Sequence, residues 1–209
     1  MAKYRHIVFD VDGTLIDTRD CILYSLQEML MTVKGERYEI EDLKFVLANT
    51  SVKNMHLLGV EEEKIPGAVE MWVANEEKNI DMIRVFDGIE EILVKLEAEG
   101  CTFGIVTSRT HEELELVFDW LPIRKYFSVC VCADDTKEHK PSAEPLLKYM
   151  ELSGAQKEEV VYIGDSASDM VCAVNAGVDC VHAVWGEPET EADATYHADK
   201  PEQLEKMFL

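Results

Sequence analysis

Near the N-terminus, an apolar run leads directly into two acids, in the order His6-Ile7-Val8-Phe9-Asp10-Val11-Asp12-Gly13-Thr14. Three apolar residues ahead of the first acid are typical of a buried strand in an α/β protein. Asp10 and Asp12 would follow the carboxyl end of that strand, where open α/β sheets place their active sites. Because side chains two residues apart on an extended chain share a face, both carboxylates could contact one ligand. A simpler interpretation is that the two acids only end the strand and shape a turn.

From residue 85 to the C-terminus, strand and helix patterns alternate. Apolar runs predict strands at 101–106, 128–133, 159–163 and 179–184. Helical spacing predicts helices at 87–99, 112–119, 142–152, 167–175 and 202–208, the first of them capped by Asp87. This alternation indicates a parallel sheet with right-handed crossovers, so the predicted fold class is α/β with a Rossmann-like core.

Between the first strand and residue 84, the sequence carries helical patterns only. Helices are predicted over 18–33, 41–47, 52–58 and 61–79, and no strand pattern lies between Asp17 and Arg84. We therefore expect a core made of residues 1–15 and 85–209, with a small α-helical domain of residues 16–84 inserted into it.

The composition limits the class of partner. Hydrophobic residues make up 47% of the chain, enough for a proper core, while 20 Lys and Arg stand against 42 Asp and Glu, a formal net charge of −22. A surface this acidic repels nucleic acid and anionic lipid, so we expect neither a nucleic acid nor a membrane as partner. An anionic substrate would need a local cation to approach, and a divalent metal ion could supply it.

The cysteines indicate buried, reduced thiols rather than a metal site. Cys130-Val131-Cys132 alternates along a predicted strand, and no second cysteine pair accompanies it to build a zinc site. The N-terminal residues do not resemble a signal peptide, and no apolar run is long enough to span a membrane. We expect a cytoplasmic protein. The six cysteines are Cys21, Cys101, Cys130, Cys132, Cys172 and Cys180.

Three further polar signals follow predicted strands. Thr107 ends the run Gly104-Ile105-Val106, Lys140 precedes Pro141 after the third strand, and Gly164-Asp165-Ser166-Ala167-Ser168-Asp169 follows the fourth. Each signal alone has an ordinary explanation as a turn hydroxyl, a solvated lysine or a helix cap. Together they would crowd several carboxylates at one rim, and like charges that close need compensation. Mg²⁺, which prefers carboxylates and phosphate oxygens, would provide it, with Lys140 as a second cation.

In this order, the four signals resemble the four motifs of the haloacid dehalogenase-like hydrolase superfamily, and the chain is similar to its phosphoglycolate phosphatase-like members. The resemblance implies a Rossmann-like core with a helical cap domain. It also implies that Asp10 is the nucleophile of phosphoryl transfer, forming an aspartyl-phosphate, and that Asp12 is the general acid/base. Thr107, Ser108 and Lys140 would hold the phosphoryl group.

The same resemblance implies a Mg²⁺ site made by Asp10, the backbone carbonyl of Asp12, and Asp165, with Asp169 as a ligand or as a residue that orients the others. In relatives, substrate specificity comes largely from the cap domain. The polar break between two predicted helices, Asn49, Thr50, Ser51 and Lys53, is the candidate here, although it could equally be an ordinary loop. The family's K-P-x-P pattern departs at Ala143, which we expect to alter loop rigidity rather than chemistry.

The leading hypothesis is therefore a Mg²⁺-dependent phosphatase that hydrolyses a small phosphorylated metabolite. A sugar phosphomutase on the same core is the nearest alternative. A haloacid dehalogenase fits less well, because that branch does not use the second acid and Asp12 is present. A non-catalytic binding or regulatory module fits least, because every expected catalytic position is filled.

Overall fold

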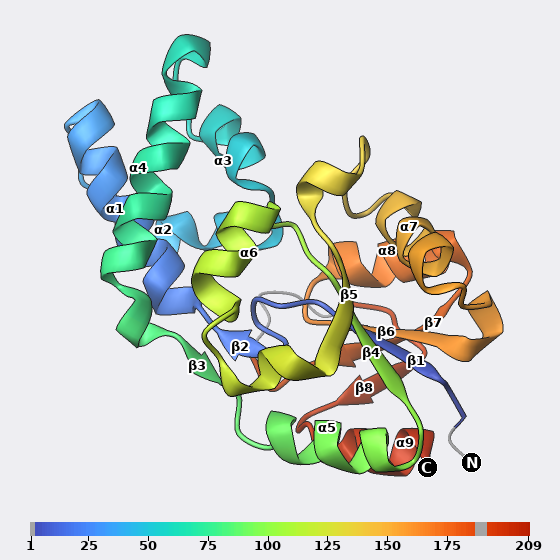
Figure 1. Cartoon of the computed structure of the whole chain (residues 1–209). Helices are drawn as coiled ribbons and strands as arrows, with labels where there is room; N and C mark the ends of the chain where they lie inside the picture. Colours follow the sequence, from blue (N-terminus) through green and yellow to red (C-terminus); the bar gives the residue numbers. More distant parts are fainter. Residues whose placement is uncertain (1–2, 187–191) are drawn as a thin grey trace.

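The centre of the molecule is a six-stranded sheet in the order β5-β4-β1-β6-β7-β8, with every neighbouring pair parallel (Figure 1). The structure, a computed structural model, describes residues 3–186 and 192–209, so residues 1–2 and 187–191 of the predicted core lie outside the described residues. The strands are β1 (His6–Phe9), β4 (Thr102–Val106), β5 (Phe127–Val131), β6 (Val160–Gly164), β7 (Asp179–Ala183) and β8 (Tyr196–Ala198). The predicted α/β class with a parallel sheet is confirmed.

The strand order reverses at β1, which pairs with β4 on one side and with β6 on the other. Its side chains alternate between two cores. Ile7 and Phe9 pack into the cluster beneath α5 (Ile89–Ala98) and α9 (Gln203–Phe208). Val8 packs into the cluster beneath α7 (Glu144–Ser153) and α8 (Ala167–Ala176). All three side chains are fully buried, and each such burial stabilises the fold by about 1.5–3 kcal/mol. This apolar strand therefore anchors the sheet at the position where α/β folds bind ligands.

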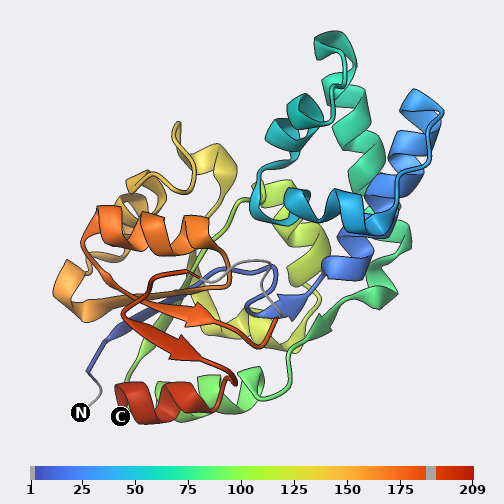
Figure 2. The same ribbon diagram turned by 180° about the vertical axis from the view of Figure 1, so that it is seen from behind.

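Helices cover both faces of the sheet. Figure 2 shows α5 and α9 side by side on one face and α8 on the opposite face. On the first face, α6 adds Leu114, Val117 and Phe118 to the same apolar cluster. The helices around the sheet are α5 (Ile89–Ala98), α6 (His111–Phe118), α7 (Glu144–Ser153), α8 (Ala167–Ala176) and α9 (Gln203–Phe208).

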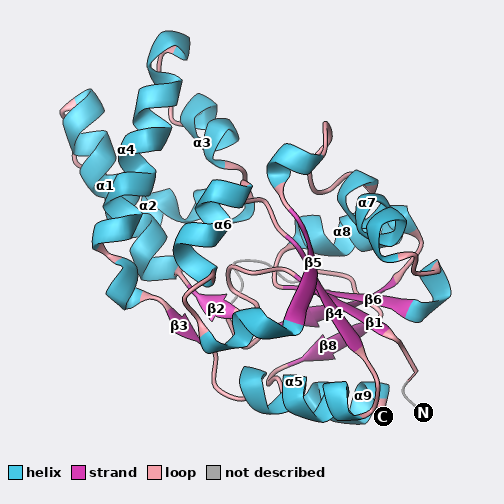
Figure 3. Cartoon of the chain, in the orientation of Figure 1, coloured by secondary structure: helices cyan, strands magenta, loops and turns pink. Residues whose placement is uncertain are grey.

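The residues between β2 and β3 form a group of helices with its own apolar cluster, apart from the sheet (Figure 3). We call residues 18–83 the helical segment. Its two long helices pack together, and the Trp72 indole donates a hydrogen bond to the Ile22 carbonyl, 3.2 Å away. The segment contains α1 (Arg19–Lys34), α2 (Ile40–Leu43), α3 (Ser51–Leu57) and α4 (Ile65–Lys78), with 3₁₀ helices η1 (Lys44–Ala48), η2 (Glu62–Lys64) and η3 (Ile80–Met82).

Two short strands join the helical segment to the rest of the chain. β2 (Ile16–Asp17) and β3 (Arg84–Val85) pair antiparallel, with Asp17 opposite Arg84. The chain therefore leaves and re-enters the core at neighbouring points. Sequence patterns did not predict either strand, and they also missed β8 at the edge of the main sheet.

The remaining predicted elements are found with shifted ends, except that the helix predicted over 41–47 consists of α2 followed by the 3₁₀ helix η1. The helix predicted over 61–79 is interrupted, because η2 comes first and α4 begins at Ile65 with Pro66 in its first turn. The predicted cap at Asp87 is wrong, since the residue preceding α5 is Gly88. Short 3₁₀ turns also precede β5 and β6, at Pro122–Tyr126 and Lys157–Glu159.

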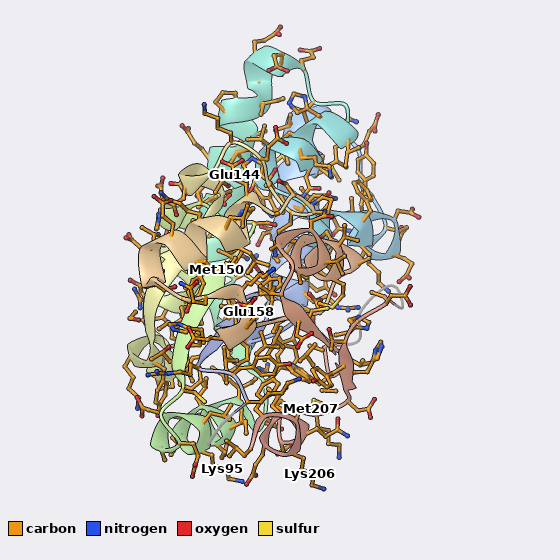
Figure 4. All side chains as sticks on the ribbon, turned by 90° about the vertical axis from the view of Figure 1, so that its right-hand side faces the viewer. Lys95, Glu144, Met150, Glu158, Lys206 and Met207 are labelled. Carbon is orange, nitrogen blue, oxygen red and sulfur yellow. The ribbon has the colours of Figure 1, made fainter. Side chains whose placement is uncertain are left out.

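The described ends of the chain lie beside each other, away from the helical segment. The Lys3 backbone N–H donates to the Phe208 carbonyl at 2.8 Å. Figure 4 shows Lys95 of α5 and Lys206 of α9 at the same end of the molecule, with Glu144 of α7 toward the other end.

Among the described residues, no helix has both the length and the apolar character that crossing a membrane requires.

Candidate active site

The sequence-predicted carboxylates meet at the carboxyl ends of the central strands. Asp10 follows β1, while Asp165 and Asp169 lie at the junction of β6 and α8. One oxygen from each of these three carboxylates lies within 4.8 Å of the others. This is the spacing of ligands around one metal ion, and carboxylate oxygens are the donors that Mg²⁺ prefers.

Lys140, which precedes α7, reaches the same point. Its Nζ lies 3.0 Å from Asp10 Oδ1 and 2.7 Å from Asp169 Oδ1. Burial alone would lower the pKa of Lys140, but the two carboxylates hold it above its ordinary value, so the side chain is an ammonium. The hydroxyl of Tyr162 also accepts a hydrogen bond from Nζ, at 3.3 Å.

Two glycines allow the carboxylates to come together. Gly13 has φ of +73°, and a Cβ on it would lie 2.1 Å from Asp165 Oδ2. A Cβ on Gly164 would lie 2.5 Å from Cβ of Asp169. A side chain at either position would therefore displace a carboxylate from the cluster.

Asp169 is fully buried and both of its oxygens have partners. Oδ1 accepts hydrogen bonds from Lys140 Nζ and from the Tyr162 hydroxyl, and Oδ2 accepts from the Ser166 backbone N–H at 3.0 Å. Burial alone would raise the pKa of Asp169, but Lys140 and these hydrogen bonds hold it below its usual value. Of the two roles considered for Asp169, these contacts favour orienting its neighbours over binding a metal.

Asp10 and Asp165 have excess negative charge around them. Burial raises the pKa of Asp10 to about 7 against the opposing effect of Lys140, with Asp169 adding to the rise. Burial also raises the pKa of Asp165, with Asp169 as the charge that adds most to the rise. Three carboxylates share one ammonium, so a divalent cation would neutralise the remaining charge.

A cavity of about 330 Å³ opens over these groups, between the sheet and the helical segment. Asp10, Asp12, Lys140 and Asp165 line it from below, together with Ser108. Thr107 does not line the cavity: it is buried beside it, and its hydroxyl accepts a hydrogen bond from the Arg109 backbone N–H at 3.2 Å.

The polar residues predicted for the helical segment divide between two cavities. Asn49, Ser51 and Lys53 line the site cavity, whereas Thr50 lines a neighbouring cavity of about 550 Å³ that Ser51 also borders. Thr50 serves as the N-cap of α3, accepting a hydrogen bond from the Lys53 backbone N–H. Helix capping explains Thr50 without a ligand.

Sequence reasoning missed the partners of Asp12. The guanidinium of Arg109 binds both Asp12 oxygens, with Nε–Oδ2 at 2.8 Å and Nη2–Oδ1 at 2.9 Å, and the Thr18 hydroxyl donates to Oδ1 at 2.5 Å. The remaining terminal nitrogen of Arg109 binds Glu76 of α4 at 2.8 Å. One signal was available, because Glu76 stands four residues after Trp72, on the predicted apolar face of its helix.

Burial alone would raise the pKa of Asp12, but Arg109 and Thr18 outweigh it and hold the pKa below its usual value. In this arrangement Asp12 is an ionised acceptor. It is well placed to take a proton, and it can donate one only after it has itself bound one.

All six cysteines are free thiols, and five of them are buried. Cys132 lies near His111, Asp134 and Asp135, with one ligand atom of each within 4.8 Å of the others. Hydrogen bonds within the group account for this arrangement, since Asp135 Oδ2 lies 2.9 Å from His111 Nε2 and 2.8 Å from the Cys132 backbone N–H.

A family model described as haloacid dehalogenase-like hydrolase matches residues 7–183. The chain belongs to this family. The match confirms the resemblance carried by the four motifs, and it confirms that the chain is an enzyme of a hydrolase family. The non-catalytic alternative is correspondingly disfavoured.

Several known proteins resemble the chain over nearly its whole length. Pyrophosphatase PpaX from Bacillus cereus (strain AH820) is 30% identical over 98% of this chain and 94% of its own. A Lactobacillus plantarum crystal structure, provisionally assigned as a phosphoglycolate phosphatase, superposes with a TM-score of 0.90 at 27% identity, covering 99% of this chain and 100% of that one. CbbY from Rhodobacter sphaeroides, solved with phosphate, shares the fold at a TM-score of 0.84 and 18% identity, with 96% of each chain covered.

Proposed function

We propose that this chain is a phosphatase that uses Mg²⁺ to hydrolyse a small phosphorylated metabolite through an aspartyl-phosphate on Asp10. One observation carries the proposal. The Asp10 carboxylate stands at the end of β1, 3.0 Å from Lys140 Nζ and within 4.8 Å of Asp165 and Asp169 oxygens, and it faces a cavity. A buried nucleophile with a fixed cation and a set of metal ligands is what phosphoryl transfer requires.

In the first half of the proposed reaction, an Asp10 oxygen attacks phosphorus and the bond to the leaving oxygen breaks. Asp12, which must carry a proton at this stage, gives it to that oxygen, and the alcohol or phosphate product leaves. In the second half, Asp12 takes a proton from water, whose oxygen attacks the aspartyl-phosphate. Inorganic phosphate is released and the Asp10 carboxylate is restored.

Asp10, the backbone carbonyl of Asp12, and Asp165 would hold Mg²⁺. When bound, the ion would neutralise charge on the phosphoryl oxygens and on the crowded carboxylates. Lys140 contributes a second positive charge at a fixed position, held there by Asp169. Ser108, which lines the cavity, and Thr107 behind it would contact the remaining phosphoryl oxygens.

We further propose that residues 16–84 are a cap domain over a core of residues 1–15 and 85–209. The cavity is lined from both parts, so closing the helical segment over it would exclude bulk water from the aspartyl-phosphate. Ser51 and Lys53 are the better candidates for substrate preference, because they line this cavity and Thr50 does not.

The helical segment also brings basic residues to the cavity of a strongly acidic protein. Arg19, Lys44 and Lys53 line it, in addition to Lys140, whereas Arg109 is held there by Asp12 and Glu76. This lining favours a substrate with a second anionic group, as in pyrophosphate or phosphoglycolate, the kinds of compound for which relatives are named.

A panel of phosphorylated metabolites, assayed for phosphate release with Mg²⁺ and with EDTA, tests the proposal. We expect release from one or more doubly anionic members, abolished by EDTA and restored by added Mg²⁺. Conversion of a sugar phosphate into its isomer without phosphate release would instead identify a phosphomutase. Activity that survives EDTA would refute the metal-dependent mechanism.

A further inference from the structure

A row of three charged groups, two of them buried and Asp12 partly buried, connects the helical segment to the proposed acid/base. Asp12 belongs to the loop after β1, Arg109 to the loop after β4, and Glu76 to α4. The side chains of Arg109 and Glu76 are 9% and 6% exposed, and that of Asp12 is 18% exposed. Figure 1 shows α4 beside α6, the helix that follows the Arg109 loop.

Stability alone does not account for this arrangement. Removing a charge from water costs several kcal/mol, and apolar side chains of similar volume are often at least as stabilising as a buried ion pair. Here two carboxylates share one guanidinium, so the group keeps a net negative charge. A buried charged network that stabilises the fold no better than apolar side chains would is a candidate for a functional role.

The contacts set the direction of the Asp12 carboxylate. A carboxylate offers about four acceptor sites. Arg109 Nη2 and the Thr18 hydroxyl occupy Oδ1, and Arg109 Nε occupies one site of Oδ2. Among the described residues these contacts leave one acceptor site, on Oδ2. The planar guanidinium, binding both oxygens, fixes the plane in which that site lies.

Glu76 sets the direction of Arg109 in turn. Its Oε2 binds Nη1 at 2.8 Å, so all three guanidinium nitrogens are held, two by the core and one by the helical segment. A shift of α4 would therefore turn the guanidinium and, with it, the Asp12 carboxylate.

We infer that Arg109 is a positioning residue for Asp12, and that Glu76 acts through Arg109 to link the helical segment to the acid/base. The inference rests on the proposed function, because it needs Asp12 to transfer the proton. It assigns no contact with the substrate to either residue. It predicts that disturbing the contacts between Glu76, Arg109 and Asp12 impairs proton transfer to the leaving group specifically, and not phosphoryl transfer in general.

Leaving-group dependence tests this specificity. For p-nitrophenyl phosphate the leaving oxygen is weakly basic and departs without a proton, whereas phenyl phosphate needs one. The value of kcat/KM compares the transition state with free enzyme and free substrate, so it reports the step in which the leaving group departs. We expect Arg109→Lys to lower kcat/KM for phenyl phosphate by about 100-fold, the cost of a misplaced catalytic group. The value for p-nitrophenyl phosphate should change little.

Glu76→Gln provides the second variant, since it leaves the Arg109–Asp12 pair in place and is less prone to unfold the protein. We expect the same selective loss at smaller size. The double variant E76Q/R109K should be no worse than R109K alone, because residues that act through one another are not additive. The matched control is Glu113→Gln: Glu113 is equally buried and contacts Ser51 of the helical segment, but it does not contact Arg109. It should leave the ratio of the two substrates unchanged.

Equal losses on both substrates, or additive effects of the two substitutions, would show a purely structural role and overturn the inference. Asp12→Asn calibrates the assay and must itself show the selective loss. If the D12N loss is equal on both substrates, the proposed role of Asp12 is wrong, and the inference falls with it. If the unmodified enzyme releases phosphate from neither aryl phosphate and from no member of the metabolite panel, the proposed function itself is wrong. A selective D12N with an unselective R109K removes only the inference.

Discussion

At the scale of single residues, the carboxylate that follows β1 carries the proposal. Asp10→Asn removes the nucleophile while keeping the shape of the side chain, so turnover should fall by about 10³-fold or more. Phosphate release measures the loss, and circular dichroism checks the fold. Asp20→Asn, at an exposed position of α1, is the control and should retain turnover. An active D10N enzyme would contradict the assignment of the nucleophile.

The raised pKa values of Asp10, to about 7, and Asp165 predict that Mg²⁺ binding competes with protons. Below about pH 7 Asp10 holds a proton in the folded protein, and a metal ion must displace it. Affinity should therefore increase with pH in this range, by about tenfold per pH unit for the proton displaced from Asp10.

Isothermal titration calorimetry at pH 6, 7 and 8 checks this dependence, and repeating it in buffers with different ionisation heats counts the protons released. In the D10N enzyme the slope should decrease, because one titrating ligand is gone. An affinity that stays constant between pH 6 and 8 would contradict the raised pKa values.

Residue patterns predicted the cluster of Asp10, Lys140, Asp165 and Asp169 because each group follows a strand or precedes a helix of a parallel sheet. The carboxyl ends of parallel strands meet at one edge of the sheet, so residues that follow these strands are brought close together. The partners of Asp12 were not predictable in this way. Arg109 lies in a loop whose direction the pattern leaves open, and Glu76 reaches it only through the packing of α4 on the core.

At the scale of elements, the contact between β4 and α7 depends on a residue without a side chain. A Cβ on Gly104 would lie 1.9 Å from Cε2 of Tyr149, a ring held in the apolar cluster under α7. Gly104→Ala should lower the free energy of unfolding by about 1–3 kcal/mol, because the ring or the helix must move. Urea denaturation measures the change.

Gly67 of α4 supplies the opposite expectation. Apart from its chain neighbours and the nearby backbone of its own helix, no atom of the described residues lies within 4 Å of a Cβ built there, and the position is helical. Gly67→Ala should therefore raise the unfolding free energy by about 0.5–1 kcal/mol, through the lower backbone entropy of the unfolded chain. If both variants changed stability in the same direction, the packing explanation for Gly104 would be wrong.

Element lengths explain which parts of the fold the sequence revealed. Strands of four or five mostly buried residues, such as β1 and β6, gave clear apolar runs. β2 and β3 have two residues each, too few for any alternation, and β8 has three. Their pairing comes from neighbouring chain segments rather than from a local pattern.

At the scale of the whole molecule, the formal charge of −22 should slow the arrival of anionic substrates. Salt shortens the Debye length from about 30 Å at 0.01 M to about 8 Å at 0.15 M, which screens this repulsion. With Mg²⁺ held at saturation, kcat/KM for a dianionic phosphate ester should rise over that range of KCl. Tetramethylammonium chloride should give the same gain, since screening depends on ionic strength. A decrease with salt would mean that the basic lining of the cavity outweighs the acidic surface.

The β2–β3 ladder makes the structure of the main sheet independent of the length and structure of the helical segment. Because Asp17 and Arg84 already face each other across this ladder, the two points where the segment departs and returns stay fixed whatever lies between them. A different insertion, longer or shorter, would need only to bring its own ends together, without shifting β1 or β4. One hydrolytic core could thus acquire new substrate preferences by exchanging everything beyond a single pair of short strands.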